Sequence, residues 1–191
     1  MLPEQGVPVK FLLLKHNYEN SGRSLVCRKD LYDERIWDSS NNDYATSDID
    51  TWLTGTYLNL IDAEIRAQIA AVNIKSSTGN GTYNVRDLSR KVFLLSYTEV
   101  GFPENSRAKI EGTALPYFCS NIRRIAYLNG TSAYWWLRTP NTGNTGMGWY
   151  VKGADYGNGV MNSGGSRPAF TLPAGMLFNP EPNPDGSYGP L

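Results

Sequence analysis

The sequence predicts a mixed α+β domain with two helices, short strands and long irregular loops. Apolar runs of strand length are scattered along the 191 residues, two stretches have helical spacing, and polar segments rich in Gly, Asn and Pro separate them. We expect one domain over residues 1–173 and a Pro/Gly-rich tail over residues 174–191. In that tail, proline recurs at every second position from Pro180 to Pro184, which excludes a sheet interior.

A β-hairpin is predicted near the start of the chain. Residues 9–14 and 24–28 are apolar and of strand length. The segment between them, residues 17–22, is rich in Asn, Ser and Gly, which are turn residues. We therefore expect two antiparallel strands.

The first helix is predicted to begin at Ser47, an N-cap residue with Asp50 three positions later as in a capping box. Ile49, Trp52 and Leu53 are spaced to bury one face of this helix. Gly55 is expected to end it.

The second helix is predicted to follow a cap at Asp62. Four aliphatic residues recur at spacings of four and three, which is typical of a helix with one buried face. They are Ile61, Ile65, Ile69 and Val72.

The remaining elements are mostly strands. Residues 91–96 form a continuous apolar run that predicts a buried strand, and a short helix is expected around residues 117–125. The last predicted strands cover residues 135–138, 149–151 and 167–172.

Composition excludes several classes of protein. The formal net charge is zero, so the chain has no electrostatic basis for coating nucleic acid. Its longest early apolar run, residues 11–14, is far below the roughly 20 residues of a membrane-spanning helix, and we expect no membrane insertion. No signal peptide is visible at the N-terminus.

We expect neither a metal nor a cofactor. Cys27 and Cys119 lie far apart in sequence and form no metal-binding motif, so we interpret them as unpaired thiols, although a disulfide stays open. His16 is the single histidine, and we place it in a loop. Residues 181–183 match a calcium-dependent sugar-binding tripeptide, but the Trp-Asn-Asp partner motif does not follow it.

The run of residues 141–166 is the most distinctive part of the chain. It holds eight of the 19 glycines and no Leu, Ile or Phe, and most of its positions are small, polar or Tyr. Tyr, Ser, Gly and Asn are the residues that antibody paratopes use, because Tyr gives broad contact and the others give adaptable hydrogen bonds. A binding surface and a solvated loop are both compatible with this composition.

Eight residues of this run are our candidate ligand contacts. Strand alternation predicts that Tyr150, Lys152 and Tyr156 share one face. The candidates are Asn141, Asn144, Tyr150, Lys152, Asp155, Tyr156, Asn158 and Asn162.

Two arginines flank the run. Trp135 and Trp136 should point to opposite faces of the strand that carries Arg138. Arg138 and Arg167 can each pair with a carboxylate or with loop carbonyls and so hold the ends of the run together. The alternative is that they grip an anionic ligand.

These motifs resemble those of a family of mostly uncharacterised domains in bacteria and their phages. The family pattern W-W-L-R-[S/T]-P corresponds to residues 135–140, a Tyr-Val strand to residues 149–151, and G-x-R-P-A-[F/L] to residues 165–170. Its upstream features resemble residues 37–69 and the K-V-F-L-L-S strand at residues 91–96. This sequence departs from the pattern at three positions, which are Asp50, Thr54 and Ser166.

The resemblance implies a C-type-lectin-like fold close to that of formylglycine-generating enzymes. Such a fold has two helices packed on short twisted antiparallel strands and a loop-rich ligand face. Related folds display the variable residues of proteins that retroelements diversify, and the run of residues 141–166 is compatible with such variation. The enzyme activity is not implied, because its paired active-site cysteines have no counterpart near the C-terminal motif.

We therefore expect a non-enzymatic module that binds a cell-surface protein or glycan of a bacterial host. It would be displayed on a phage tail or fibre or on a bacterial surface, as an oligomer or as part of a virion. The alternative is a structural virion component, such as a decoration or baseplate protein, whose loops and Pro-rich tail make subunit contacts.

A glycan hydrolase is the third hypothesis. Such an enzyme needs a pair of carboxylates about 5–10 Å apart. The candidates lie in one irregular segment and are Asp33, Glu34, Asp38, Asp43 and Asp48. Residues of this kind more often cap helices and solvate loops.

Overall fold

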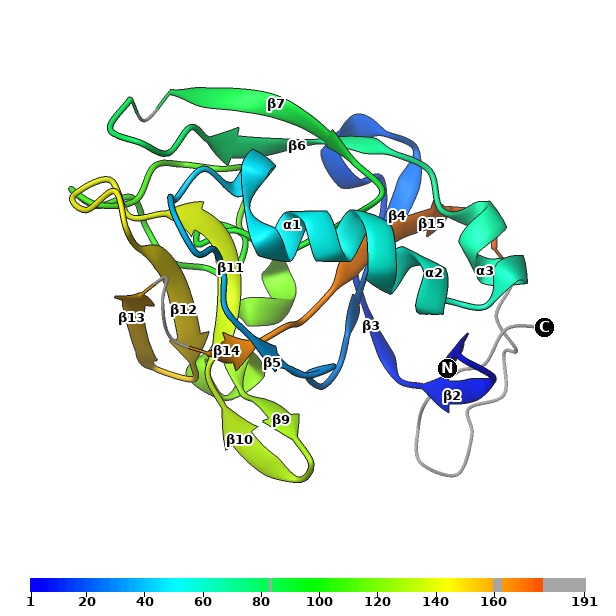
Figure 1. Cartoon of the computed structure of the whole chain (residues 1–191). Coiled ribbons are helices and arrows are strands. Elements are labelled where there is room, and N and C mark those ends of the chain that lie inside the picture. Colours follow the sequence, from blue (N-terminus) through cyan, green and yellow to red (C-terminus); the bar gives the residue numbers. More distant parts are fainter. Residues whose placement is uncertain (83, 160–162, 177–191) are drawn as a thin grey trace.

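The computed structural model of the protein is dominated by β-strands arranged in several small sheets (Figure 1). It describes residues 1–82, 84–159 and 163–176. Asn162 and most of the predicted tail lie outside these residues. The predicted α+β arrangement of two helices on a sheet is wrong, and so is the C-type-lectin-like fold that the resemblance implied.

Two sheets form the body of the fold. In the larger one the strand order is β13-β12-β11-β14-β5. Its strands are β5 (Glu34–Arg35), β11 (Trp135–Pro140), β12 (Gly148–Lys152), β13 (Asp155–Gly159) and β14 (Gly164–Gly165). In the smaller one the order is β3-β4-β15-β8. Its strands are β3 (Phe11–Lys15), β4 (Arg23–Arg28), β8 (Val92–Phe93) and β15 (Ala169–Pro173).

Three separate hairpins complete the sheet structure of the described residues. Figure 1 shows β6–β7 running above the helical segment, and β9–β10 projecting from the opposite end of the molecule. They are β1 (Leu2–Glu4) with β2 (Val7–Val9), β6 (Val72–Ser77) with β7 (Val85–Arg90), and β9 (Ala126–Leu128) with β10 (Thr131–Ala133).

The predicted N-terminal hairpin is confirmed, because β3 and β4 pair as antiparallel strands with Phe11 opposite Arg28. The other partner of β4 is β15, which joins the two ends of the chain in one sheet. The apolar run of residues 91–96 is buried as predicted, although only Val92 and Phe93 are paired as a strand.

The first helix is longer than predicted. α1 (Asp48–Trp52), a π-helical turn η3 (Leu53–Tyr57) and α2 (Leu58–Leu60) form one helical segment of 13 residues. Ser47 caps it as predicted, since its Oγ accepts a hydrogen bond from Asp50 N at 3.2 Å. The prediction that Gly55 ends the helix is wrong, because Leu53 and Tyr57 are both fully buried and anchor the turn that contains it.

The second predicted helix shrinks to six residues, α3 (Ala63–Gln68). Its four aliphatic residues are all buried, but three of them reach the core in extended backbone. Ile61 forms a β-bridge with Glu4, Ile69 ends the helix with an extended conformation, and Val72 begins β6. The spacing therefore predicted burial correctly and conformation incorrectly.

Short 3-10 helices fill the remaining connections of the described chain. In place of the helix predicted around residues 117–125 the structure has two such turns. The 3-10 helices are η1 (Tyr18–Asn20), η2 (Tyr44–Thr46), η4 (Pro116–Phe118) and η5 (Asn121–Arg124).

Candidate ligand-binding site

Twelve of the 26 residues in the distinctive run of residues 141–166 lie in strands that the structure describes. A seven-residue loop, residues 141–147, is closed at its base by a hydrogen bond of 2.7 Å from Asn141 N to Met147 O. The β12–β13 hairpin follows, and β14 pairs with both β11 and β5. Strand pairing thus fixes much of a segment whose composition suggested a permissive loop.

Asn42 holds the 141–147 loop in place from another part of the chain. Its buried side-chain amide donates to the carbonyl oxygens of Asn141, Asn144 and Met147 at 3.1, 2.9 and 3.0 Å. Its Oδ1 accepts from Asn80 N at 2.8 Å. One side chain therefore ties this loop to the loop after β6, which makes the end of the molecule rigid.

Two predicted contacts belong to this loop. Asn141 is only 1% exposed, and its Oδ1 accepts from Gly143 N at 2.8 Å, so its side chain shapes the loop from inside. Asn144 is exposed, and its Oδ1 accepts from Gly146 N at 3.0 Å. Asn144 is thus the one of the two whose side chain a ligand can reach.

The outer face of the β12–β13 hairpin carries a group of five residues that we call the aromatic ledge. It consists of Tyr134, Tyr150, Lys152, Asp155 and Gly157. Tyr134 is 41% exposed, and its ring centroid lies 4.9 Å from that of Tyr150 in an edge-to-face arrangement. Lys152 Nζ lies 5.5 Å from the centroid of the Tyr134 ring. The ledge unites three predicted contacts with Tyr134, which sequence reasoning missed although it lies two residues before Trp136.

The ring of Tyr150 lies directly on the strand backbone. A Cβ atom at Gly157, its partner on β13, would lie 2.6 Å from Tyr150 Oη. Trp136 supports the ring from β11, with its centroid 5.5 Å away. The ring orientation is therefore set by the sheet itself.

Two further glycines of the run have the same role. A Cβ atom at Gly148 would lie 3.1 Å from the Trp37 ring, and one at Gly164 would lie 2.7 Å from the Trp136 ring. Glycine is needed at these positions because an indole ring lies against the backbone. Aromatic packing thus explains three of the eight glycines that made the run resemble a flexible paratope.

Tyr156 lies on the opposite face of the hairpin, so the prediction that it shares a face with Tyr150 and Lys152 is wrong. It is paired with Val151 in the strand register, while Tyr150 is paired with Gly157. Its ring packs 4.9 Å from Phe102 and 5.9 Å from Tyr97, although its side chain is still 52% exposed. Burial raises the pKa of Tyr97 to about 12.

Three candidate contacts remain, which are Asn158, Asn162 and Asp155. Asn158 lies on β13 opposite Trp149. Asn162 lies outside the described residues. Asp155 is exposed and stands opposite Lys152 at the turn of the hairpin. Of the eight candidates, the structure therefore brings together Tyr150, Lys152 and Asp155.

Arg138 is fully buried at the centre of the molecule. Its Nη1 donates to Glu99 Oε2 at 2.7 Å and to Leu94 O at 2.9 Å, and its Nε donates to Lys75 O at 2.8 Å. Burial lowers the pKa of Arg138, but the neighbouring Glu99 carboxylate more than offsets this, so the pKa rises.

Two more groups extend this buried network. Tyr18 Oη donates to Glu99 Oε1 at 2.5 Å. Glu111 is also fully buried, and its Oε2 accepts from Thr139 Oγ1 at 2.5 Å. Burial raises the pKa of the Glu111 carboxyl group. These polar groups are satisfied inside the protein, so we assign the network a structural role.

Arg167 is buried to 1% exposure and has no carboxylate partner among the described residues. Its Nε and Nη2 donate to the carbonyl oxygens of Arg28 and Lys29 at 3.0 and 2.8 Å. The guanidinium lies 4.7 Å from the centroid of the Trp135 ring. Burial lowers its pKa.

The two arginines therefore do not join the ends of the run to each other. Arg138 uses both kinds of partner that the sequence suggested, a carboxylate and loop carbonyls, whereas Arg167 uses carbonyls. Neither guanidinium is exposed to a ligand in solution. Trp135 and Trp136 are both buried, and each indole donates to a carbonyl, that of Arg124 and that of Arg35, at 2.8 Å.

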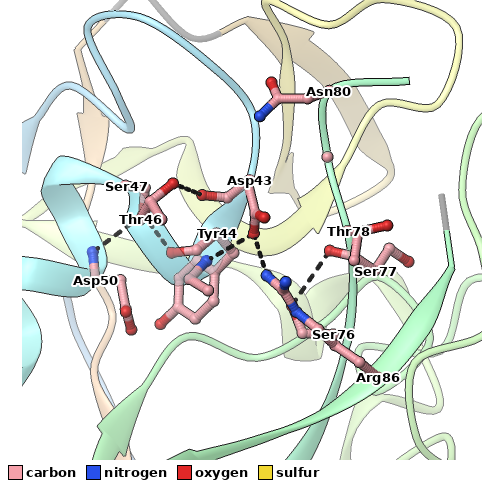
Figure 2. Close-up of polar contacts among 12 residues, drawn as sticks. Asp43, Tyr44, Thr46, Ser47, Asp50, Ser76, Ser77, Thr78, Asn80 and Arg86 are labelled. Carbon is pink, nitrogen blue, oxygen red and sulfur yellow. Dashed lines mark hydrogen bonds and ion pairs between the residues drawn. The ribbon is translucent and has the colours of Figure 1, made fainter. Parts of the chain in front are cut away.

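The carboxylates proposed for hydrolysis have local structural partners. Figure 2 shows Arg86 reaching from β7 to pair with Asp43, which also accepts a hydrogen bond from Ala45 N at 3.1 Å. Asp38 is buried and accepts from the backbone of Ser40, Asn41 and Asp48.

The other three carboxylates lie near the surface. Asp33 pairs with Arg35, and Asp48 Oδ2 accepts from Ser39 N at 3.0 Å. Glu34 is exposed, and its backbone is paired with Gly165. No cluster of three or more His, Cys, Asp or Glu residues suited to a metal ion occurs in the described part of the chain.

Both cysteines are free thiols, and the histidine lies in a turn. Cys27 is a free, buried thiol and Cys119 is a free, exposed one. Burial raises the pKa of Cys27 to about 11. His16 is exposed in the turn after β3, and its Nδ1 lies 2.9 Å from Ser24 Oγ. Among the residues described, no helix is long and apolar enough to span a membrane.

The fold and site define a β-rich domain with a buried charged centre and an exposed aromatic ledge. Residues 11–174 match the family described as Domain of unknown function (DUF6273), and the chain belongs to this family. The matched region contains the ledge, both buried arginines and Asn42. No curated protein and no solved structure matches the chain.

Proposed function

We propose that the protein is a non-enzymatic binding module whose ligand face is the aromatic ledge. The observation that carries this proposal is unused hydrogen-bonding capacity at a partly exposed surface, where Tyr134 and Asp155 are exposed and Tyr150 and Lys152 are half-buried. The hydroxyl groups of Tyr134 and Tyr150 have no hydrogen-bond partner among the described residues, and Lys152 and Asp155 make no ion pair there. Such groups are free to bond a ligand.

The rigidity of the ledge supports the same proposal. Tyr150 is packed against Trp136 and the backbone of Gly157, and Tyr134 packs against Tyr150. Ordering a side chain on binding costs about 0.5–1.5 kcal/mol, and a ring that is already oriented avoids most of that loss. Tyrosine also offers broad contact with few rotatable bonds.

We further propose that the module is displayed on a phage tail or fibre or on a bacterial surface, as an oligomer or within a virion. Its partner there would be a protein or glycan on the surface of a bacterial cell. Membership of the family and the paratope-like composition around the ledge are compatible with this setting.

The test compares binding of the labelled protein to a panel of Gram-positive and Gram-negative cells, measured by flow cytometry. The double variant Tyr134→Ala, Lys152→Gln should lose binding while its melting temperature stays within a few degrees. Tyr127→Ala is the matched control, because Tyr127 is 45% exposed on β9 and has no ring contact with the ledge. Equal binding by the double variant and the wild type would contradict the proposal.

A further inference from the structure

We propose that the ligand of the aromatic ledge is a neutral carbohydrate. This inference rests on the proposed function and narrows it from a protein or glycan to one class of ligand. Two properties of the ledge carry it, namely its combination of partly exposed tyrosine rings with unpaired polar groups, and its balance of charge.

The chemistry of the ledge matches that of a sugar. The face of a tyrosine ring carries negative charge density, so it attracts the polarised C–H groups on one side of a pyranose. The two tyrosine hydroxyls and Lys152 can donate hydrogen bonds, and Asp155 can accept them. Sugar hydroxyls both donate and accept, so they can pair with either kind of group.

The charges of the ledge favour a neutral ligand over a charged one. Lys152 and Asp155 stand opposite each other in the strand register, so the pair contributes no net charge. An acidic polymer would gain from Lys152 but would be repelled by Asp155 at the same distance along the hairpin. A neutral sugar is repelled by neither residue.

Affinity electrophoresis tests the inference directly. The full chain is run through native gels that contain dextran, mannan, laminarin or galactan, and through a gel without polysaccharide. We expect retardation by at least one of these neutral polymers. Tyr134→Ala should weaken it by about tenfold, because exposed aromatic anchors carry much of the energy of a small site. Tyr127→Ala should migrate like the wild type.

Two treatments of the cells distinguish a failure of this inference from a failure of the proposed function. In the cell-binding assay, periodate oxidation of the cells should abolish ledge-dependent binding, and protease treatment should leave it intact. Absence of retardation in every gel, together with binding that resists periodate and is lost on proteolysis, overturns the carbohydrate inference and leaves the proposed function standing. Retardation that Tyr134→Ala does not change shows that the polysaccharide binds elsewhere and overturns the carbohydrate inference, while cell binding by the double variant still decides the proposed function.

Discussion

Arg138 and Arg167 flank the same run and are both buried, yet their partners differ, and Nη1 of Arg167 has no hydrogen-bond partner among the described residues. Arg138 faces the carboxylate of Glu99, which raises its pKa despite burial. Arg167 has carbonyl oxygens and aromatic rings around it, and its pKa is lowered. Arg138 thus belongs to an ion pair whose members depend on each other, whereas Arg167 leaves no ionised partner behind if it is removed.

This difference indicates which of the two regions contributes more to the stability of the fold. Removing one member of a buried ion pair leaves an uncompensated charge in the interior, which is strongly destabilising. Removing a cation that bonds carbonyls leaves only unpaired neutral groups. The centre around Arg138 should therefore tolerate single substitutions far less well than the region around Arg167.

The largest effect is expected for Glu99→Ala. It leaves Arg138 buried without its counter-charge and Tyr18 without its acceptor, so the free energy of unfolding should fall by about 3–5 kcal/mol. Urea denaturation followed by tryptophan fluorescence measures this loss. The double variant Glu99→Gln, Arg138→Met should recover part of it, and a double variant less stable than Glu99→Ala would contradict the ion-pair explanation.

A smaller loss is expected for Arg167→Met. The carbonyls of Arg28 and Lys29 lose their donors, which corresponds to about 1–3 kcal/mol, but no charge is stranded. Arg138→Met is the matched control in the same urea assay and should be clearly less stable, because it strands Glu99. Equal losses for the two variants would mean that the carboxylate partner makes no difference.

The stability of the protein at alkaline pH gives a third test of the region around Arg138. Burial raises the pKa of Tyr18 well above its usual value, and Glu99 raises it further. A raised folded-state pKa gives stability that is complete below the unfolded value of about 10 and is lost as the pH rises beyond it. Above the unfolded-state pKa, ionisation of each such tyrosine can lower the free energy of unfolding by at most about 1.4 kcal/mol per pH unit.

Stability measured in urea at pH 9, 10 and 11 tests this directly. Tyr44 and Tyr57 have pKa values raised by burial in the same direction, so the wild type should lose stability steeply. Tyr18→Phe should be less stable than the wild type at pH 9 and should lose less between pH 10 and pH 11. Parallel curves for the two proteins would show that Tyr18 does not contribute to the alkaline loss.

The smallest effect is expected on the ledge. Tyr134→Ala removes a partly exposed ring that has no hydrogen bond to the described residues but packs edge-to-face on Tyr150, so the free energy of unfolding should fall by about 1 kcal/mol or less. Thermal denaturation followed by circular dichroism should find a melting temperature close to that of Tyr127→Ala. A loss as large as that of Arg167→Met would mean that the ledge is part of the core.

Local sequence signals predicted the parts of the fold that depend on near neighbours. The β3–β4 hairpin and the Ser47 cap follow from turn and capping residues within a few positions. Periodicity located the buried residues between Ile61 and Val72 but not their conformation, because a helix and an extended chain can both bury residues at those positions.

The candidate site was predicted only in part, for a similar reason. The face of Tyr156 depends on the turn between β12 and β13, which sets Val151 opposite it, and simple alternation counted through the turn gives the wrong side. The roles of Asn42 and Glu99 come from contacts with residues up to about a hundred positions away, and a single sequence carries no signal for such pairings.

The way in which Asn42 holds the 141–147 loop has a consequence for protein engineering. The side-chain amide of Asn42 donates to backbone carbonyl groups of the loop. A backbone hydrogen bond from Asn141 to Met147 closes the base of the loop. None of these anchors uses a side chain of residues 142–146. The loop can therefore accept a foreign recognition sequence at the cost of the side-chain hydrogen bonds of Thr142 and Asn144.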